Sequence, residues 1–179
     1  MSEPMSPRRR EIVETALRIL EAEGREALTM RRLAGEIGIR APSLYKHFPD
    51  KAAVEIALIE IGFTGMADAL DTALAQEDDH GCSPLERLAI AYRRYALEHP
   101  HLYRLLTSDP LPRERLQPGV EARAAWPLVR TVQDPDLARA VWAFAHGMVI
   151  LELNGRFPPD ADLDGAWRAG VGGFEAAME

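Results

Sequence analysis

The hydrophobic positions of this chain recur with helical spacing over most of its length. The clearest stripe is formed by Ile12, Val13, Ala16, Leu17 and Leu20, whose spacing places them on one face of a helix. No segment shows the sustained alternation of apolar and polar residues, bounded by turn signals, that is typical of a half-buried strand. The pattern therefore predicts an all-α fold without a sheet.

Glycines, prolines and capping residues divide this pattern into about nine helices. Gly24 and Gly38 are placed to end the first two, and Thr29 is a suitable N-cap for the second. Asp50 and Ser83 can cap the fourth and fifth helices. Residues 108–118 contain three prolines and are expected to be irregular. The helices after the first are expected to cover about residues 30–37, 41–48, 51–74, 84–98, 100–107, 119–131, 135–154 and 161–178.

The second and third helices are expected to meet at a tight corner. Ala34 is small enough for close crossing, and Gly38 allows a left-handed turn. The side chains of Ile37, Ile39 and Leu44 would pack inside the corner. This arrangement is typical of a helix-turn-helix, whose second helix enters the major groove of DNA. Helical hairpins without a DNA function can carry the same small residues.

The third helix has one polar and one apolar face. Ser43, Lys46 and His47 project together, whereas Leu44 and Phe48 form the opposite face. Basic side chains suit the guanine O6 and N7 atoms in the major groove. The polar face therefore supplies donors for bases or phosphates.

The segment that carries these residues resembles the signature of the TetR family of transcriptional regulators. Residues 38–51 read GIRAPSLYKHFPDK, with the Leu-Tyr-x-His-Phe core, the breaker and the following Lys of that signature, and the resemblance covers about residues 10–56. It implies phosphate contacts from Thr29, Tyr45, His47 and Lys51, and a base-reading surface of Arg40, Ala41, Pro42, Ser43 and Lys46. The alternatives are edge packing for Tyr45 and an ordinary surface position for His47.

The charge of the chain is unevenly distributed. The net charge is −7, but residues 1–51 balance at +2 and residues 52–179 at −9. Such asymmetry favours a polyanion-binding module on an acidic body, although chance variation of a solvated surface would look the same. Arg8, Arg9 and Arg10 are either an arm that reaches DNA or a solvated tail.

Several classes of protein are disfavoured by the residues present. The single cysteine, Cys82, excludes a disulfide framework and a cysteine-rich zinc site. No nucleophile–base pair or metal-ligating cluster is evident, so we expect no enzyme, no metal and no cofactor. The N-terminus shows no secretory signal, and residues 140–151, the most apolar segment, are too few to span a bilayer. We therefore expect a cytoplasmic protein without membrane contact.

Apolar and aromatic side chains in the body could line a small-molecule pocket, although core packing is the alternative for each one. The TetR resemblance implies such an effector pocket. The candidate lining residues are Phe63, Met66, Tyr92, Tyr95, Tyr103, Leu106, Trp126, Trp142 and His146. Trp142, His146 and Gly147 also resemble the Trp-His-Gly signature of one subclass, and residues 98–103 fit it.

The helix expected at residues 135–154 is apolar over more of its circumference than one face of a monomer needs. The resemblance implies that the last two helices pair with their symmetry mates in a four-helix bundle. The candidate interface residues are Leu137, Val141, Phe144, Met148, Trp167 and Val171. A twofold homodimer would place two recognition helices on half-sites about 34–36 Å apart, or a multiple of that.

Together these patterns predict two domains and one function. Residues 1–52 would form the helix-turn-helix domain, and residues 53–179 the domain for effector binding and dimerisation. The expected function is that of a repressor that a small molecule releases from a near-palindromic DNA operator. The alternatives are an activator of the same family, a helical interaction protein that has lost DNA binding, and a helical enzyme or ligand carrier.

Overall fold

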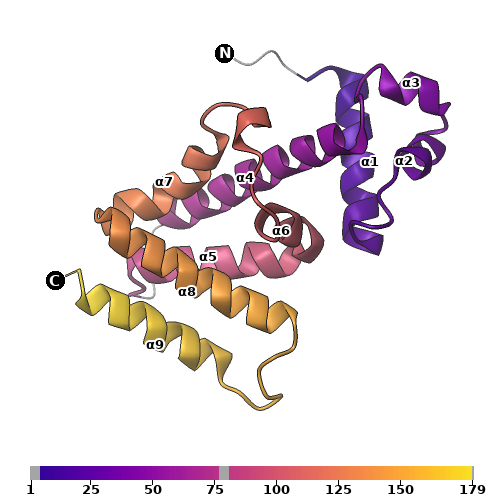
Figure 1. The fold of residues 1–179 in the computed structure, drawn as a ribbon. Helices are drawn as coiled ribbons and strands as arrows, with labels where there is room; N and C mark the ends of the chain where they lie inside the picture. Colours follow the sequence, from indigo (N-terminus) through magenta and orange to yellow (C-terminus); the bar gives the residue numbers. More distant parts are fainter. Residues whose placement is uncertain (1–4, 77–80, 179) are drawn as a thin grey trace. The chain divides into compact units, whose positions relative to one another are not determined.

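The computed structural model describes residues 5–76 and 81–178, and in these residues it contains nine α-helices and no strand (Figure 1). The predicted all-α fold is confirmed. The helices are α1 (Pro7–Glu23), α2 (Met30–Ile37), α3 (Ala41–Tyr45), α4 (Lys51–Ala75), α5 (Pro84–Glu98), α6 (Pro100–Thr107), α7 (Val120–Val132), α8 (Pro135–Leu153) and α9 (Leu163–Ala176). The segment that was expected to be irregular contains one 3₁₀ turn, η1 (Arg113–Arg115).

The chain forms two compact units, and the first contains the helix-turn-helix. This unit comprises residues 1–62 and 99–118, so it holds α1, α2, α3, the first part of α4 and α6. In it, α1 packs against α2 and α6, and α2 packs against α3. Of the five residues in the predicted α1 stripe, Ile12, Val13, Ala16 and Leu20 are buried, while Leu17 is half-buried. The stripe therefore forms the inner face of this unit.

The corner of the helix-turn-helix contains the predicted cap and turn, with Leu44 buried and Ile37 and Ile39 half-buried. The Thr29 hydroxyl accepts a hydrogen bond from the backbone N–H of Arg32 at 3.1 Å, which caps α2. Gly38 ends α2 in the left-handed region, with φ of 72°. The third helix ends at Tyr45 rather than at residue 48. After Tyr45 the N–H of His47 bonds to the Leu44 carbonyl, three residues back, so the chain tightens into a turn before Pro49.

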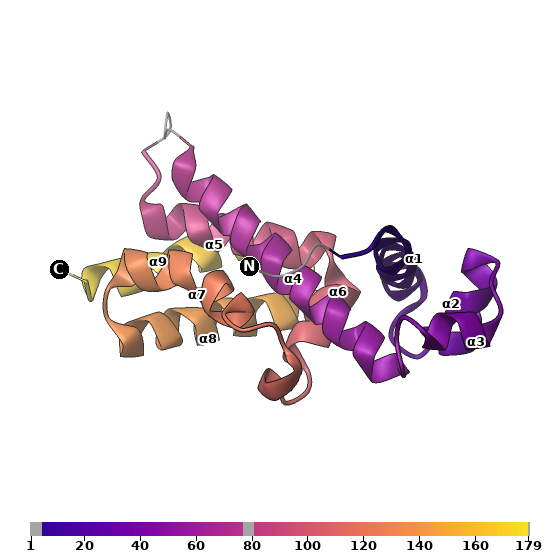
Figure 2. The ribbon, with the colours of Figure 1, turned by 90° about the horizontal axis from the view of Figure 1, so that it is seen from above.

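The second unit comprises residues 63–98 and 119–179. In it, α5 packs against α7, α8 and α9, and α8 packs against α7 and α9. Its core includes a cluster formed by Leu85, Val132, Ala138, Val141 and Val171. Helices α8 and α9 lie side by side (Figures 1 and 2). They approach so closely that a Cβ atom at Gly170 would lie 2.1 Å from the Phe144 ring.

The division by packing differs from the domain boundary that the sequence suggested between residues 52 and 53. Helix α4 contributes residues to both units, and α6 with the segment after it belongs to the unit of the helix-turn-helix. The two units are defined by contacts between residues and not by their roles. The proposed boundary between the DNA-binding and effector-binding domains therefore stays a prediction.

Two further observations concern residues 5–76 and 81–178. No helix among them combines the length and apolar character needed to cross a bilayer. The same residues contain no group of three or more His, Cys, Asp or Glu side chains that could hold a metal ion.

Candidate nucleic-acid interface

Helix α3 presents a polar face to solvent and buries its apolar face, as the sequence predicts. Leu44 and Phe48 are fully buried, with 0% of their surface exposed. Arg40, Pro42, Ser43, Tyr45 and Lys46 are exposed, and Ala41 and His47 are partly exposed. The polar residues of the candidate base-reading set therefore gather on one accessible surface.

Several polar side chains of this face have no hydrogen-bond or ion-pair partner in the described part of the protein. Within the part of the chain that the structure describes, the side chains of Arg40, Ser43 and Lys46 make no hydrogen bond or ion pair. The hydroxyl of Tyr45, whose side chain is 49% exposed, is likewise unbonded there. These groups are donors that bases or phosphates can reach without breaking a protein contact.

Contacts with neighbouring residues, rather than intrinsic helix stability, must hold α3 in place. The helix has five residues and no side-chain hydrogen bond at its N-cap. A helix of this length is unstable by itself in water. Its anchors are Leu44 and Phe48 below it and Arg9 beside it: the guanidinium of Arg9 donates to the His47 carbonyl at 2.9 Å and lies 4.3 Å from the centre of the Phe48 ring.

The arginines near the N-terminus are structured. Arg8, Arg9 and Arg10 lie in the first turns of α1, so they form neither a free arm nor a solvated tail. Ser6 caps this helix by accepting from the Arg9 N–H. The sequence could not reveal the contact of Arg9 with α3, because the two segments are 38 residues apart.

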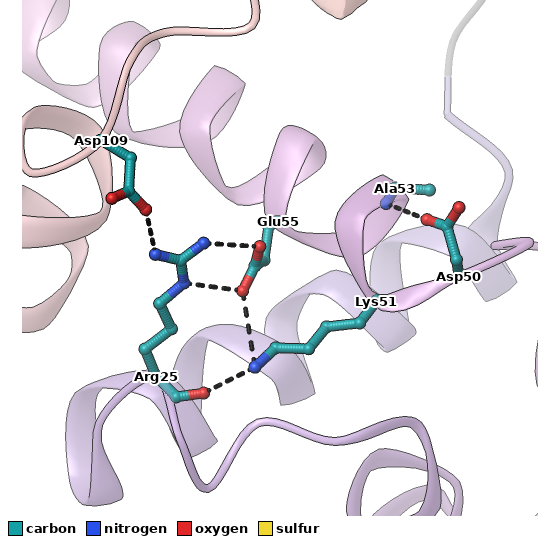
Figure 3. Close-up of polar contacts among 6 residues, drawn as sticks. All are labelled: Arg25, Asp50, Lys51, Ala53, Glu55 and Asp109. Atoms are coloured by element: carbon teal, nitrogen blue, oxygen red, sulfur yellow. Dashed lines mark hydrogen bonds and ion pairs between the residues drawn. The ribbon is translucent and has the colours of Figure 1, made fainter.

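Lys51, the predicted phosphate contact at the start of α4, belongs to a polar cluster (Figure 3). Its ammonium group donates to the backbone carbonyl of Arg25 at 3.0 Å and lies 3.6 Å from a carboxylate oxygen of Glu55. The Arg25 guanidinium donates to both oxygens of Glu55, at 2.9 and 3.1 Å, and also to Asp109 in the segment after α6. The cluster therefore fixes the direction of the Lys51 side chain.

Arg25, Glu55 and Asp109 are not among the residues predicted to bind DNA. Glu55 follows Lys51 by one helical turn, which is a signal that the sequence contains. Asp109 is 84 residues from Arg25, and no local pattern could join them. The hydrogen bonds to Glu55 and Asp109 raise the pKa of Arg25 above its already high ordinary value, so its guanidinium remains charged.

Thr29, the other predicted phosphate contact, lies exposed at the start of α2. Its oxygen accepts from Arg32, while its own hydroxyl hydrogen remains available for donation. Thr29 can therefore cap its helix and bind a phosphate at the same time.

The predicted effector-pocket residues are divided between the two units. Tyr103 and Leu106 belong to the first unit, and the other seven to the second. Met66 and Tyr95 are buried, whereas Trp126 and Trp142 are 57% and 50% exposed. A groove of about 580 Å³ along α5 and α9 is lined by other residues, among them Ile90, Leu97 and Trp167. The pocket stays a prediction.

Trp142 and His146, which belong to that set, stack on each other along α8. Their ring centroids are 5.9 Å apart. Burial lowers the pKa of His146 below its ordinary value, because the charged imidazolium is less well solvated there.

Half of the predicted dimer-interface residues are buried inside the protomer. Val141, Trp167 and Val171 are at most 6% exposed. Phe144 packs edge-on against Trp167, with the ring centroids 5.6 Å apart. These residues hold α8 against α9 within the chain. The exposed residues are instead Trp142 and Leu151, which lie on opposite sides of α8, and Ala166, Ala169, Gly172 and Gly173 on α9.

Comparison with known proteins agrees with this geometry. Residues 12–58 match the family model described as "Bacterial regulatory proteins, tetR family". Residues 85–174 match the model described as "Tetracyclin repressor-like, C-terminal domain". The Trp-His-Gly motif at residues 142–147 lies inside the second match, and the subclass it suggests stays a prediction.

Individual relatives cover nearly the whole chain. The "Uncharacterized HTH-type transcriptional regulator Rv0681" of Mycobacterium tuberculosis is 31% identical over 192 residues, which cover 100% of this chain and 85% of that protein. A solved structure of a protein of unknown function from Rhodococcus sp. RHA1 has a TM-score of 0.81 and 27% identity, covering 97% of both chains. The multidrug binding protein EbrR complexed with imidazole has a TM-score of 0.69 and 23% identity, covering 96% of both chains, and shares the fold.

Proposed function

This chain belongs to the tetR family of bacterial regulatory proteins and is a DNA-binding regulator of transcription, and we propose that it is a repressor that a small molecule releases from a near-palindromic operator. The observation that carries the proposal is the exposed face of α3, whose donors have no partner in the described chain. Such a face, held by a buried apolar side, is what major-groove reading requires.

The contacts divide into two chemical classes. Arg40, Ser43 and Lys46 would donate to base edges, while Ala41 and Pro42 would offer apolar contact to thymine methyl groups. Phosphates would be bound by the side chains at the margins of this face, namely Thr29, Tyr45, His47 and Lys51. Lys51 suits this role because its cluster already orients its ammonium group.

A homodimer would give the protein two such faces. The support is that Trp142 on α8 is half exposed and that α9 carries exposed small residues, which permit close approach of a second helix. Three of the six predicted interface residues, Val141, Trp167 and Val171, are buried inside the protomer and would pack beneath these exposed residues. Twofold symmetry would make the operator near-palindromic.

A small-molecule effector is proposed for the second unit. EbrR, which shares the fold, is described as a multidrug binding protein. An effector lowers operator affinity only if it binds more tightly to a state that binds DNA poorly. Helix α4 contributes residues to both units. A displacement of its second part on effector binding would therefore be transmitted along the continuous helix to the DNA-binding part.

The class of protein supports one sign of regulation and one compartment. Repression is favoured because the matched C-terminal domain is described as tetracyclin repressor-like. A bacterial transcription regulator acts where the chromosome lies, which supports a cytoplasmic location for this protein.

Fluorescence anisotropy would test operator binding. The purified chain is titrated onto duplexes that tile the region upstream of its own coding sequence, at about 150 mM salt with excess random DNA, because salt sets the non-specific background. Saturable binding to one near-palindromic duplex is expected. If neither these duplexes nor genomic fragments are bound in preference to random DNA, the proposal fails.

In vitro transcription from the bound promoter would test the sign. Added protein should reduce the transcript if it is a repressor, whereas an increase would favour the activator. Candidate small molecules can then be scored by recovery of the transcript.

A further inference from the structure

Three successive arginines begin α1, and they differ in what they contact. Arg8 pairs with Glu11 on its own helix at 2.5 Å. The side chain of Arg10 is exposed and has no hydrogen bond or ion pair with any residue described in the structure. Arg9 alone among the three reaches the end of α3, at the His47 carbonyl and the Phe48 ring.

The turn that follows α3 contains a backbone carbonyl that needs a hydrogen-bond donor from outside the helix. The helix ends at Tyr45, and the N–H groups of His47 and Phe48 both turn back to the Leu44 carbonyl. Carbonyl groups beyond a helix end have no partner within the helix. The His47 carbonyl obtains one from Arg9, at 2.9 Å.

Arg9 binds this turn in two directions at once. A guanidinium can donate in its plane and stack through its face. In this structure an N–H of Arg9 donates to the His47 carbonyl, while the guanidinium carbon lies over the ring of Phe48, 4.3 Å from its centre. Phe48 is fully buried, so this contact ties the turn to the core of the unit.

We propose that Arg9 is a positioning residue for DNA recognition, holding the turn that carries Lys46 and His47 in the orientation that reads DNA. The proposal rests on α3 being the DNA-reading helix. Arg9 acts through α3, and its effect falls on sequence-specific binding more than on the attraction of DNA by charge.

Two other roles for Arg9 make different predictions. A direct phosphate contact would make its loss reduce the salt dependence of binding, because each neutralised phosphate adds about 0.9 to the slope of log K against log salt. A purely structural role would lower thermal stability and leave the affinity of the folded protein unchanged. A positioning role lowers specific affinity and leaves the slope unchanged.

Arg10 provides a matched control for the experiment. Arg9→Met and Arg10→Met remove the same charge from adjacent positions of the same helical turn, so their long-range electrostatic effects are alike. The probes are one duplex that the wild-type chain selects from a randomised pool and one random-sequence duplex. Anisotropy titrations run from 50 to 300 mM salt, roughly the range in which phosphate contacts are revealed, at a temperature where circular dichroism shows every variant folded.

The expected result is a loss confined to the selected duplex. Arg9→Met should bind it about tenfold more weakly than Arg10→Met, which is the size expected for one charge-assisted hydrogen bond. The two variants should bind the random duplex equally, with equal salt slopes for the selected one. Arg9→Lys, which keeps the charge and one donor, should bind with intermediate affinity, and it replaces Arg9→Met if that variant does not fold.

Three outcomes would overturn the proposal. Equal affinity of the Arg9 and Arg10 variants for the selected duplex leaves Arg9 a structural role alone. A slope reduced by about 0.9 for Arg9→Met only makes it a phosphate contact. If the wild-type chain selects no duplex at all, the assignment of α3 as the reading helix fails first, and the role of Arg9 falls with it.

Discussion

Helices α3 and α8 are both central to the proposed function, and they differ in how their residues are divided between inside and outside. In α3, the polar positions face solvent, and Leu44 is fully buried. In α8, apolar residues occur on both sides: Val141 is buried in the core cluster, while Trp142, the next residue, is half exposed. In a helix with two chemically distinct faces, the sequence indicates which face is buried. In a helix that is apolar all round, the buried face depends on which other helices pack against it.

The largest effect is expected from the buried face of the helix-turn-helix. Phe48→Ala removes a ring with no exposed surface and also the partner of Arg9, and it should destabilise the first unit by about 3–5 kcal/mol. Urea denaturation followed by circular dichroism measures the change. Tyr45→Ala, on the exposed face of the same helix, is the control and should cost less than about 1 kcal/mol. Similar losses for both would contradict the two-faced description of α3.

The next effect tests which face of α8 pairs with a second chain. Trp142→Arg places a charge on the exposed face and should weaken dimerisation by about 2 kcal/mol or more, roughly thirtyfold, with the protomer still folded. Sedimentation velocity across a concentration series measures it.

Val141→Ala is the matched control on the adjacent, buried position. It should lower the unfolding free energy of the protomer and change the dimer dissociation constant little. If Val141→Ala dissociated the dimer and Trp142→Arg did not, the interface would lie where the sequence first suggested.

A smaller effect separates base reading from phosphate binding around α3. Lys46→Ala should cost about 1–3 kcal/mol of specific affinity and relax the preference at one base position. Lys51→Ala should weaken binding to all sequences alike and reduce the salt slope by about 0.9. Anisotropy titrations on matched and single-mismatch duplexes distinguish the two. Loss of discrimination from Lys51→Ala would reverse the assigned roles.

The smallest effect concerns pH and the stacked pair on α8. Burial lowers the pKa of His146 in the folded chain below the 6.5 of the unfolded one, so the unfolded state binds more protons in acid. The contribution of His146 to stability is therefore present above pH 6.5 and is lost as pH falls through the lowered pKa. His146→Gln should reduce the loss of unfolding free energy between pH 7 and pH 5, measured by urea titration. An unchanged pH profile would show that His146 is solvated equally in both states.

Much of the candidate DNA-binding surface could be predicted because its signals are local. The Thr29 cap, the Gly38 turn and the alternation of faces in α3 each depend on residues within one or two helical turns. The expected end of α3 at Phe48 is wrong by three residues, because the apolar periodicity continues to Phe48 although a turn replaces the helix after Tyr45.

The contacts that position these residues were not predictable. Arg9 meets His47 across 38 residues, and Arg25 meets Asp109 across 84. Arg9 and Arg25 stand at ordinary surface spacings, and nothing in their local sequence distinguishes them from unpaired arginines. The effector pocket stays a prediction for a related reason: aromatic residues at helical spacing identify helices but do not reveal which of them face a common space.

The sequence by itself determined the helices, the helix-turn-helix and the family, because capping, turn chemistry and amphipathic spacing act between neighbours in the chain. Tertiary structure alone decided that Val141, Trp167 and Val171 pack within the protomer. It also decided that one arginine of three holds the end of α3. These choices depend on which surfaces meet after the helices have formed, and that information is spread over residues far apart in the chain.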